Sequence, residues 1–460
     1  MKDKYVMLKN DWTIRGTAEK WILFNFKKGL CEDRFSISEN VYLILKLVTG
    51  GLTVSQISVK MGFDTIPYFD YLSELGVVDF LEKPTRKLRN FYSAYSGSNF
   101  LGRIMLHITG RCNLDCKHCY IVGKKWGKEL QFDEIVNLIR QAADLNVASF
   151  SITGGEPFVR EDLFDILREL DKQEMKIEGI FTNATIIPEK LLDEFEKLQE
   201  FPFFVSINGP FTRTHDGFVG IDGSFNKSLK TIRCLIKRGI KVFANTSLSI
   251  LIDSDEQIES FYELVKDLKI YRWRISSPFL EGNWKNNSLK FGISIEKELQ
   301  IFLKILQLWV KDKMPFDLEL GHVFRYIDGK YAQTIYAESD YVCDYFRERI
   351  VILPDGGVSA CPLLIVPPYL VGNIRRSTLE EIWEGDQMRY FKDLRVQDVV
   401  KDKCLSCAKL SKCGVGCRAN SVLMGREYED IDPEICEIFL SSTYVEFNSY
   451  LNKIGLISGG

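Results

Sequence analysis

A tight loop of three cysteines constrains this 460-residue chain more than any other feature. The run Gly110-Arg-Cys112-Asn-Leu-Asp-Cys116-Lys-His-Cys119 follows an apolar stretch, Ile104–Thr109, with the composition of a β-strand. Three thiolates on one loop can bind three irons of a [4Fe–4S] cube and leave the fourth iron open to another ligand. A structural zinc site would need four ligands, usually supplied as two close pairs. The spacing therefore favours an iron–sulfur site at the end of a strand.

Small residues end the later strand-like runs. Ser151-Ile-Thr-Gly154-Gly155-Glu156-Pro157 closes an alternating apolar stretch, and paired glycines there let the backbone approach a ligand closely. Thr182–Asn183 and Ser206–Asn208 end two further runs, and Arg274 lies at the end of another. Hydroxyl, amide and guanidinium groups at strand ends suit a ligand that carries hydroxyls and a carboxylate.

Together these motifs resemble the radical S-adenosylmethionine (SAM) superfamily. The resemblance implies that SAM chelates the open iron and that an electron from the cluster cleaves its C–S bond. In the family the Gly154–Pro157 segment holds the methionine amino group, and the position of Arg274 binds a carboxylate. The residues implied to contact SAM are Tyr120, Gly154, Gly155, Glu156, Thr182, Asn183, Ser206, Asn208 and Arg274. The family more often has Asp at the position of Asn208.

Composition indicates the compartment and excludes some partners. A formal net charge of −3 gives no electrostatic footprint for nucleic acid or a membrane surface. The first residues are charged throughout, unlike a signal peptide, and no apolar run approaches the length of a membrane span. Twelve cysteines in such a chain suit metal binding in a reducing cytoplasm. We expect Cys31 and Cys234 to be structural.

The central region predicts a parallel sheet, because β-branched runs alternate there with amphipathic helical patterns such as Asp133–Leu145 and Leu191–Leu198. The expected strands are Ile104–Thr109, Ala148–Thr153, Lys176–Thr182, Phe203–Ile207, Lys241–Leu248 and Arg272–Ser276. This number of units predicts an α/β fold, a partial (β/α)6 barrel, whose ligands bind at the carboxyl ends of the strands. The candidate SAM residues Gly154 to Arg274 follow such ends.

A basic, Ser- and Gly-containing stretch over Lys83–Ser98 predicts a linker after a small N-terminal domain. We therefore expect domains at 1–90, 100–320 and 321–460. In the first, strands at Tyr5–Leu8, Lys20–Phe26 and Val77–Leu81 enclose helices at Ser38–Thr49, Thr53–Met61 and Ile66–Leu75. This order resembles a winged helix-turn-helix and the leader-recognition (PqqD-like) domain of many radical SAM enzymes. The acidic, aromatic helix 66–75 disfavours DNA. An exposed strand edge with an apolar groove would suit a precursor-peptide leader.

The last third of the chain carries seven more cysteines. Their order, Cys343-x12-Gly356-x4-Cys361, then Cys404-x2-Cys407-x5-Cys413-x3-Cys417 and Cys436, resembles the SPASM extension of peptide-modifying radical SAM enzymes. The resemblance implies that Cys404, Cys407, Cys413 and Cys436 hold one auxiliary cluster, and that Cys343, Cys361 and Cys417 hold another. A fourth ligand of the latter would come from elsewhere: a substrate thiolate, water or Asp344. A zinc ribbon on residues 404–417 would leave three cysteines unexplained.

These expectations combine into a radical SAM maturase of a ribosomally made precursor peptide, with three [4Fe–4S] clusters, SAM and an external electron donor such as flavodoxin or ferredoxin. The incomplete cysteine set favours a thioether cross-link, as in the sactipeptide and ranthipeptide family. One alternative joins carbon to carbon or to oxygen. Another is the sulfatase-maturating type, which has Asp where Pro362 stands. An alternative from a different class is a non-catalytic zinc- and DNA-binding protein, which metal analysis would distinguish.

Overall fold

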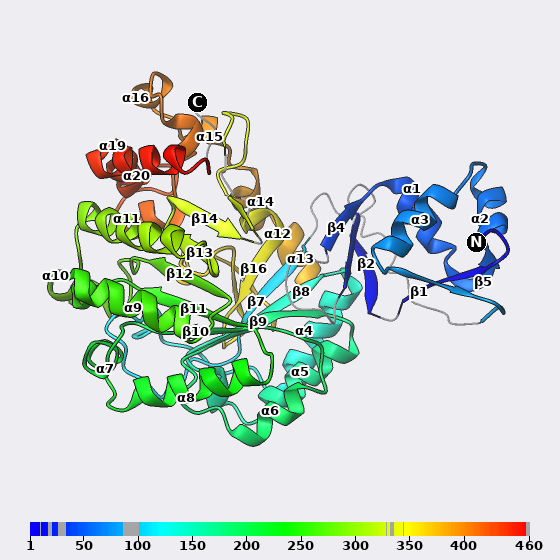
Figure 1. Ribbon diagram of the computed structural model, residues 1–460, viewed down its shortest axis with the longest axis horizontal. Helices are drawn as coiled ribbons and strands as arrows, with labels where there is room; N and C mark the ends of the chain where they lie inside the picture. The colour runs from blue at the N-terminus through cyan, green and yellow to red at the C-terminus, as the bar shows by residue number, and fades with distance from the viewer. Residues whose placement is uncertain are drawn as a thin grey trace.

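The computed structural model describes residues 1–9, 11–16, 21–25, 34–85, 101–327, 329–331, 335–343 and 345–456. Within these ranges a small N-terminal unit, residues 1–85, lies beside a larger α/β body (Figure 1). The expected linker lies outside the described residues from residue 86 onward, and so do Cys31 and Asp344. Two separate hydrophobic cores accompany the two units.

One sheet runs through the larger body, in the order β15-β14-β13-β12-β11-β10-β9-β8-β7-β16-β17-β18. Its parallel strands are β7 (Arg103–His107), β8 (Ser149–Thr153), β9 (Lys176–Thr182), β10 (Phe203–Ser206), β11 (Val242–Ser247), β12 (Arg272–Ser276) and β13 (Asp317–Leu320). The first six confirm the predicted strands to within two residues at each end. The predicted α/β fold class is confirmed, and β13 adds a parallel strand to the expected six.

Short strands extend the sheet at both edges. Beyond β13 lie the antiparallel β14 (Phe324–Ile327) and β15 (Lys330–Tyr331). On the other side β16 (Arg349–Ile352) pairs in parallel with β7, and β17 (Gly357–Ser359) and β18 (Leu370–Asn373) follow in antiparallel register. Because the chain returns to β7 after residue 348, the C-terminal region is built onto the barrel sheet and is not a detached unit.

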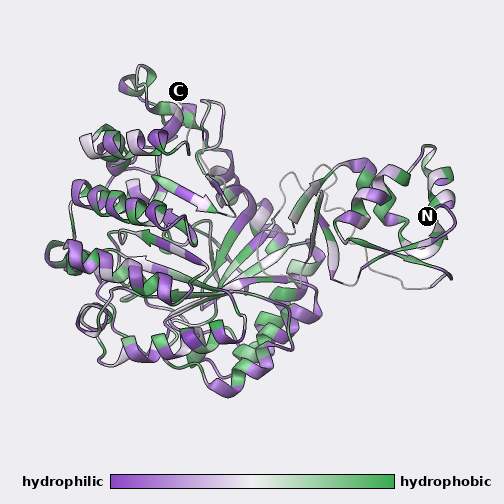
Figure 2. Ribbon diagram, in the orientation of Figure 1, coloured by the Kyte–Doolittle hydropathy of each residue, from purple (hydrophilic) through white to green (hydrophobic). Residues whose placement is uncertain are grey.

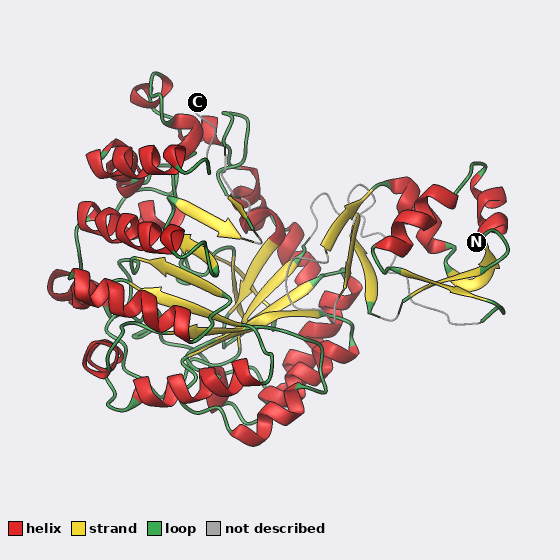
Figure 3. Ribbon diagram, in the orientation of Figure 1, coloured by secondary structure: helices red, strands yellow, loops and turns green. Residues whose placement is uncertain are grey.

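Amphipathic helices cover the outer face of the sheet (Figure 3). They are α4 (Phe132–Asp144), α5 (Leu163–Lys172), α6 (Glu189–Phe195), α8 (Ser224–Lys237), α9 (Asp255–Asp267) and α11 (Ile295–Lys311). In α4 the residues Ile135, Leu138, Ile139 and Ala142 recur at helical spacing and are fully buried. Figure 2 shows the resulting alternation of apolar and polar residues along these helices. Cys234 in α8 packs against this core, as expected of a structural cysteine.

The inward faces of the strands are polar near their amino ends. Ile104 and Leu106 of β7 point into the helix-covered core, so alternate residues such as Arg103 face the lumen. There Glu178 accepts hydrogen bonds from Ser149 and Ser151, both at 2.9 Å, and pairs with Arg103 at 3.2 Å. These satisfied polar groups fill the amino end of the lumen, which leaves the carboxyl ends of the strands for ligands.

Further helices complete the larger body. They include α7 (Thr212–Val219) and α10 (Trp284–Phe291) beside the barrel, then α12 (Tyr345–Glu348), α13 (Leu379–Glu384), α14 (Asp386–Asp393), α15 (Val396–Val399), α16 (Asp402–Leu405), α17 (Leu410–Cys413), α18 (Arg418–Leu423), α19 (Pro433–Leu440) and α20 (Ser442–Lys453). Helices α19 and α20 pack against α11. Within the described ranges, no helix combines the length and apolar character needed to cross a membrane.

The N-terminal unit contains two small sheets and three helices. One sheet has the order β5-β1-β6 and the other β2-β3-β4. The elements are β1 (Tyr5–Leu8), β2 (Trp12–Gly16), β3 (Trp21–Asn25), β4 (Arg34–Ile37), α1 (Glu39–Lys46), β5 (Thr49–Thr53), α2 (Val54–Met61), α3 (Ile66–Glu74) and β6 (Val78–Leu81). The predicted helices and the strands at β1, β3 and β6 are confirmed, whereas β2, β4 and β5 were missed. The first predicted helix was too long, because the chain enters β5 at Thr49.

Candidate active site

The predicted cysteine loop follows β7 and is held by three neighbouring segments. The first is the end of α7, where the amides of Asp115 and Lys117 donate to the carbonyls of Val219 and Phe218 at 3.1 and 2.9 Å. Gly220 ends α7 in the left-handed region, with φ +80°, and a Cβ on it would lie 2.5 Å from the Asp115 carbonyl oxygen. Backbone contacts therefore fix the outer part of the loop.

The second segment is the turn between β12 and α10. The Asn283 amide donates to the Cys119 carbonyl at 2.9 Å, and its side-chain Nδ2 donates to the Cys116 carbonyl at 2.9 Å. Asn287 donates from Nδ2 to the carbonyl of residue 117 at 3.2 Å. Gly282, at φ +57°, lies so close that a Cβ would be 2.3 Å from the Cys119 carbonyl oxygen. The sequence analysis did not single out Gly282, Asn283 or Asn287. A polar segment after a predicted strand is nevertheless the same pattern that identified the other candidate site residues.

The paired glycines after β8 form the third segment. The Gly155 amide donates to the Thr109 carbonyl at 2.8 Å, and the Glu156 amide donates to the Arg111 carbonyl at 2.8 Å. A Cβ on Gly154 would lie 2.5 Å from the Thr109 carbonyl oxygen, and one on Gly155 would lie 2.1 Å from that of Arg111. Glycine is therefore required at both positions because the cysteine loop packs directly against them. The sequence analysis had explained these glycines only by the approach of a ligand.

Glu156 ties the ends of β8 and β9 to this loop. Its fully buried carboxylate accepts from the Thr182 hydroxyl and from the Asn183 amide, each at 2.7 Å. Burial raises the pKa of Glu156 to about 7, against the lowering effect of these hydrogen bonds. The Asn183 side chain then donates to Asn113 at 2.9 Å and lies 3.9 Å from the Cys112 sulfur. Glu156, Thr182 and Asn183 therefore come together as a support for the first cysteine.

The remaining SAM candidates lie at the ends of β10 and β12. Asn208 is buried, and its Oδ1 accepts from the Ser247 amide at 2.9 Å. Its Nδ2 has no hydrogen-bond partner among the described residues, so one buried donor is left for a ligand. Ser206 is half-buried on β10, and Arg274 is exposed on β12. An unsatisfied amide donor and an accessible guanidinium fit a ligand with hydroxyl and carboxylate groups such as SAM.

The three loop cysteines lie close enough to influence one another electrostatically. Burial raises the pKa of Cys116, and the neighbouring thiols Cys119 and Cys112 raise it further. Cys112 is likewise shifted upward, by burial and then by Glu156 and Cys119. Mutual repulsion of this kind requires thiols that converge on a common volume. A cationic iron–sulfur core in that volume would reverse the shift and hold the thiolates.

The C-terminal cysteines fall into two groups in the structure. Cys361 is buried, and its pKa is raised by burial and then by Cys417 and Cys343. Burial raises the pKa of Cys413, and Cys436, Cys407 and Cys404 raise it further. Burial likewise raises the pKa of Cys436, and Cys404 and Cys407 raise it further. The structure therefore brings together three thiols in one group and four in the other.

None of these groups has the geometry of a single-ion site. Among the residues that the structure describes, no three His, Cys, Asp or Glu side chains lie close enough to hold one metal ion. The described cysteines are also free of disulfides. A cluster binds each thiolate on a different iron, so its ligands are spread more widely than the four ligands of one zinc ion. The donor sets fit iron–sulfur clusters better than a zinc ribbon.

Tyr120 lies between the cysteine loop and the first auxiliary group. Burial raises its pKa, and Cys119 and Cys361 raise it further. Burial also raises the pKa of Tyr345, and both Cys361 and Tyr120 raise it further. Its hydroxyl lies 3.9 Å from the Met105 sulfur. Tyr120 therefore lies near thiols of both groups. The sequence analysis had placed it only beside SAM.

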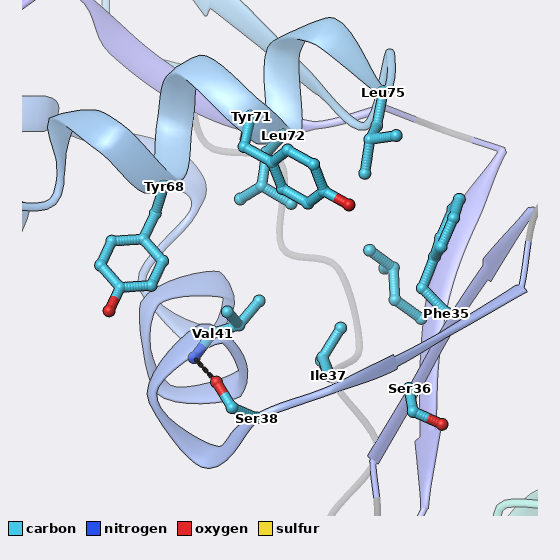
Figure 4. Close-up of a pocket in the computed structure, with 10 residues that line it drawn as sticks. Phe35, Ser36, Ile37, Ser38, Val41, Tyr68, Tyr71, Leu72 and Leu75 are labelled. Atoms are coloured by element: carbon cyan, nitrogen blue, oxygen red, sulfur yellow. Dashed lines mark hydrogen bonds between the residues drawn. The ribbon is translucent and has the colours of Figure 1, made fainter.

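A groove of about 330 Å³ lies in the N-terminal unit, between β4 and α3. Strand β4 is an edge strand, since β3 is its only neighbour in the described sheet. In Figure 4, Tyr68, Tyr71 and Leu72 of α3 face Val41 of α1 and Ile37 of β4. The Ser38 side chain caps α1 by accepting from the Val41 amide at 3.4 Å. An open strand edge beside an apolar groove is the arrangement used for β-strand addition.

Comparison with known proteins identifies two domain families in the chain. The radical SAM superfamily matches residues 106–266, and the SPASM iron–sulfur cluster-binding domain matches residues 343–408. An AdoMet-dependent heme synthase of Methanosarcina barkeri is 26% identical over 342 residues, covering 72% of this chain and 95% of that enzyme. The subtilosin biosynthesis protein AlbA of Bacillus subtilis is 25% identical over 396 residues, covering 80% of this chain and 82% of AlbA. Streptococcus suis SuiB bound to its precursor peptide SuiA matches with a TM-score of 0.69 and 17% identity, covering 94% of this chain and all of that one (100%).

Residues 106–266 of the chain form a radical SAM domain. The C-terminal part of the chain is a SPASM-type iron–sulfur domain, and the protein is a radical SAM enzyme that uses [4Fe–4S] clusters and SAM. The likeness to SuiB supports the overall fold, including the N-terminal unit.

Proposed function

We propose that this enzyme modifies a ribosomally synthesised precursor peptide by forming a thioether between a cysteine sulfur and a carbon atom. The observation that carries the peptide substrate is the open edge of β4 beside the apolar groove. AlbA acts in subtilosin biosynthesis and SuiB binds a precursor peptide, and these relatives support the same substrate class. The groove would take the leader as an added strand, with apolar side chains between α1 and α3.

Cys112, Cys116 and Cys119 would hold the cluster that binds SAM, and Asn208, Ser206 and Arg274 would contact its hydroxyl and carboxylate groups. When bound, this cluster and SAM supply a 5′-deoxyadenosyl radical that removes a hydrogen atom from an unactivated carbon. The protein's own part is positional. Glu156, Thr182 and Asn183 hold the first cysteine in place, and the polar floor around Glu178 closes the far end of the lumen.

We further propose three clusters in all. Cys404, Cys407, Cys413 and Cys436 would complete one auxiliary cluster. Cys343, Cys361 and Cys417 would supply three ligands to the other, whose fourth ligand would be the thiolate of the substrate cysteine. Iron binding would favour the deprotonated sulfur and hold it near the carbon that loses hydrogen. This arrangement supports a thioether over the carbon–carbon and carbon–oxygen alternatives.

The remaining expectations follow from the same sites. An external donor such as flavodoxin or ferredoxin would supply electrons. Free cysteines at every described position support a reducing cytoplasm. Helix α3 carries Asp70 and Glu74 on its exposed face, which disfavours nucleic acid as a partner of the N-terminal unit.

The test is anaerobic reconstitution with the short cysteine-containing peptides encoded near the gene. We expect one of them to lose two hydrogen atoms and to gain a thioether that resists thiol alkylation. The same peptide with Ser in place of Cys should still trigger 5′-deoxyadenosine formation but should not be cross-linked. A Ser peptide that is cross-linked equally well would exclude the thioether and favour the carbon–carbon or carbon–oxygen reaction.

A tetrapyrrole substrate is the second candidate, because heme synthases are among the relatives. Peptide binding and porphyrin turnover distinguish the two candidate substrates. Binding of a leader peptide by the full-length protein, with no modification of an iron porphyrin, would support the peptide. Turnover of the porphyrin without any peptide would support the heme-type activity.

A further inference from the structure

His322 differs from the other histidines of the chain. The sequence has four histidines, and all four lie in the described residues. His107 and His215 are buried, at 0% and 1% exposure, and His118 stacks on Phe218 with centroids 4.6 Å apart. His322 is exposed, and within the described ranges its imidazole makes no hydrogen bond. A histidine that is accessible and unpartnered is available to a substrate.

The turn after β13 fixes where His322 lies. The Gly321 amide donates to the Ile275 carbonyl of β12 at 2.8 Å, and the Val323 amide donates to the Leu320 carbonyl at 3.1 Å. The imidazole is therefore held at the carboxyl end of the barrel. Part of the residue is exposed to solvent, but burial of the ring among its neighbours lowers the pKa of His322; Asp432 opposes this effect and Arg274 adds to it. A lowered pKa favours the neutral ring, which is able to accept a proton.

These neighbours place His322 between the two halves of the active site. Arg274 is the residue expected to bind the SAM carboxylate. Asp432 accepts a hydrogen bond from the Cys417 amide at 3.0 Å, so it lies against the first auxiliary group. A substrate atom held between SAM and that group would lie in the space that His322 borders.

Glu298 is the rival proton acceptor. Its Oε1 would lie 3.7 Å from a Cβ on Gly321, which puts it beside His322. Burial raises the pKa of Glu298 to about 7, while hydrogen bonds from Ser277 lower it and nearby Glu434 raises it. Because the His322 residue is exposed whereas Glu298 is half-buried, His322 is the more accessible acceptor.

We propose that His322 is the catalytic base that takes the proton lost by the peptide during cross-linking. This inference rests on the proposed peptide modification. The reaction removes two hydrogens from the peptide: a hydrogen atom leaves one carbon in the SAM-dependent step, and the S–H bond of the cysteine breaks as the S–C bond forms. The proton goes to the imidazole, and the remaining electron goes to an iron–sulfur cluster of the SPASM domain as one-electron acceptor. The same balance holds for an O–H or C–H partner.

The first test separates hydrogen abstraction from bond formation. With a peptide deuterated at the reacting carbon, His322→Gln should transfer deuterium to 5′-deoxyadenosine within twofold of the wild-type rate. Cross-linked product should fall by about 100-fold, in the range typical of a lost general base. Added imidazole should restore product in His322→Ala. Lys330→Gln, on the exposed β15, serves as the control and should behave as wild type.

The pH profile provides a readout that a structural role would not change. Wild-type cross-linking should decline as pH falls and the imidazole becomes protonated, and this acid limb should disappear in His322→Gln. The groups that face the imidazole are Arg274, Glu298, Asp432 and, behind Glu298, Glu434. Glu298→Gln should retain the acid limb. If Glu298→Gln loses product and His322→Gln does not, the base is Glu298 and the proposal fails.

A second test needs no turnover. Diethyl pyrocarbonate acylates neutral, accessible imidazoles, so His322 should be modified before the other three histidines, as read by peptide mass mapping. Precursor peptide should slow this acylation severalfold. Leader binding, measured separately by fluorescence anisotropy, distinguishes the two levels of failure: a peptide that binds without protecting His322 overturns this proposal, whereas absence of any peptide binding overturns the proposed function.

Discussion

The barrel site and the N-terminal groove are built in opposite ways. Around the cysteine loop, carbonyl and amide groups of α7, the Gly154–Gly155 segment and Asn283 are paired with the loop backbone. In the groove, the edge of β4 has no strand partner on its outer side in the described sheet, and Tyr71 is 58% exposed. The site for radical chemistry is thus preorganised by the chain, whereas the groove leaves hydrogen-bonding groups for another chain to satisfy.

The two regions also lie at opposite ends of the barrel strands. The Arg15 side chain donates to the Glu174 carbonyl at 3.2 Å, and Lys176 donates to the Asn25 carbonyl at 3.5 Å, so the N-terminal unit touches the start of β9. The SAM candidates Thr182 and Asn183 lie at and just beyond its other end. Seven residues of β9 separate these positions by roughly 20 Å. The proposed leader site and the proposed reaction site are therefore separable in space, and each should be removable without the other.

Removing the loop thiols should have the largest effect. Cys112→Ala, Cys116→Ala and Cys119→Ala together should abolish 5′-deoxyadenosine formation, because no ligands remain for the SAM-binding cluster. Auxiliary iron and leader affinity should be unchanged. The measurements are iron and sulfide content, SAM cleavage and anisotropy with a labelled leader. SAM cleavage by the triple variant would show that the loop is not the SAM site.

Gly155→Ala should come next, since its Cβ would lie 2.1 Å from the Arg111 carbonyl oxygen. The loop must shift, and we expect SAM cleavage to fall at least about tenfold, as is common when reacting groups are misplaced. Gly217→Ala is the matched control, because a Cβ there meets nothing within 4 Å. Equal activity of the two variants would contradict the tight packing described for the glycine pair.

A change in the groove should affect recognition alone. Tyr71→Glu puts a charge among apolar groove residues, and leader affinity should fall about tenfold, as for an aromatic interface residue. Peptide-independent SAM cleavage should be unaffected. Val59→Glu, on an 82% exposed position of α2, is the control for added surface charge. Equal leader affinity in both variants would argue that the leader binds elsewhere.

The separation of the two regions predicts that the precursor needs a minimum number of residues, a spacer, between its leader and the part that is modified. Deleting about seven spacer residues removes roughly 20 Å of reach. We expect several-fold slower modification at unchanged leader affinity, because the core peptide is then held less often at the strand ends. Restoring the length with Gly and Ser should restore the rate. Modification that ignores spacer length would place the leader site nearer the carboxyl ends.

Local patterns in the sequence were sufficient for much of this architecture. Strand ends such as Thr182 follow from periodicity within short segments, whereas the division of the later cysteines into two auxiliary groups came from the family resemblance. What was missed depends on residues far apart in the chain. Asn283 acts on a loop more than 160 positions earlier, as its bond to Cys116 spans 167 residues. Strand β5 contains Gly50 and Gly51, which β-propensity disfavours, and it forms only because β1 pairs with it.

The smallest expected effect concerns the joint between the barrel and the SPASM domain, where Arg375 pairs with Glu134. Arg375 donates to both carboxylate oxygens of Glu134, at 2.6 and 2.9 Å. The hydrogen bond from Arg375, followed by that from the Gln131 amide, lowers the pKa of Glu134 to about 2. The carboxylate pKa is thus depressed on folding, so its stabilisation is complete above the ordinary value of about 4.3 and is lost as pH falls from there towards 2.

Glu134→Gln should therefore reduce the free energy of unfolding at pH 7 by about 0.2–1 kcal/mol, the range for partly exposed pairs. The difference from wild type should shrink as the pH is lowered below 4. Urea unfolding at both pH values measures it, with Glu380→Gln on the exposed face of α13 as control. Because Glu134 and Arg375 touch neither the groove nor the cysteine loop, leader affinity and SAM cleavage should stay at wild-type levels. A destabilisation that is equal at both pH values would mean that the carboxylate charge does not hold this joint.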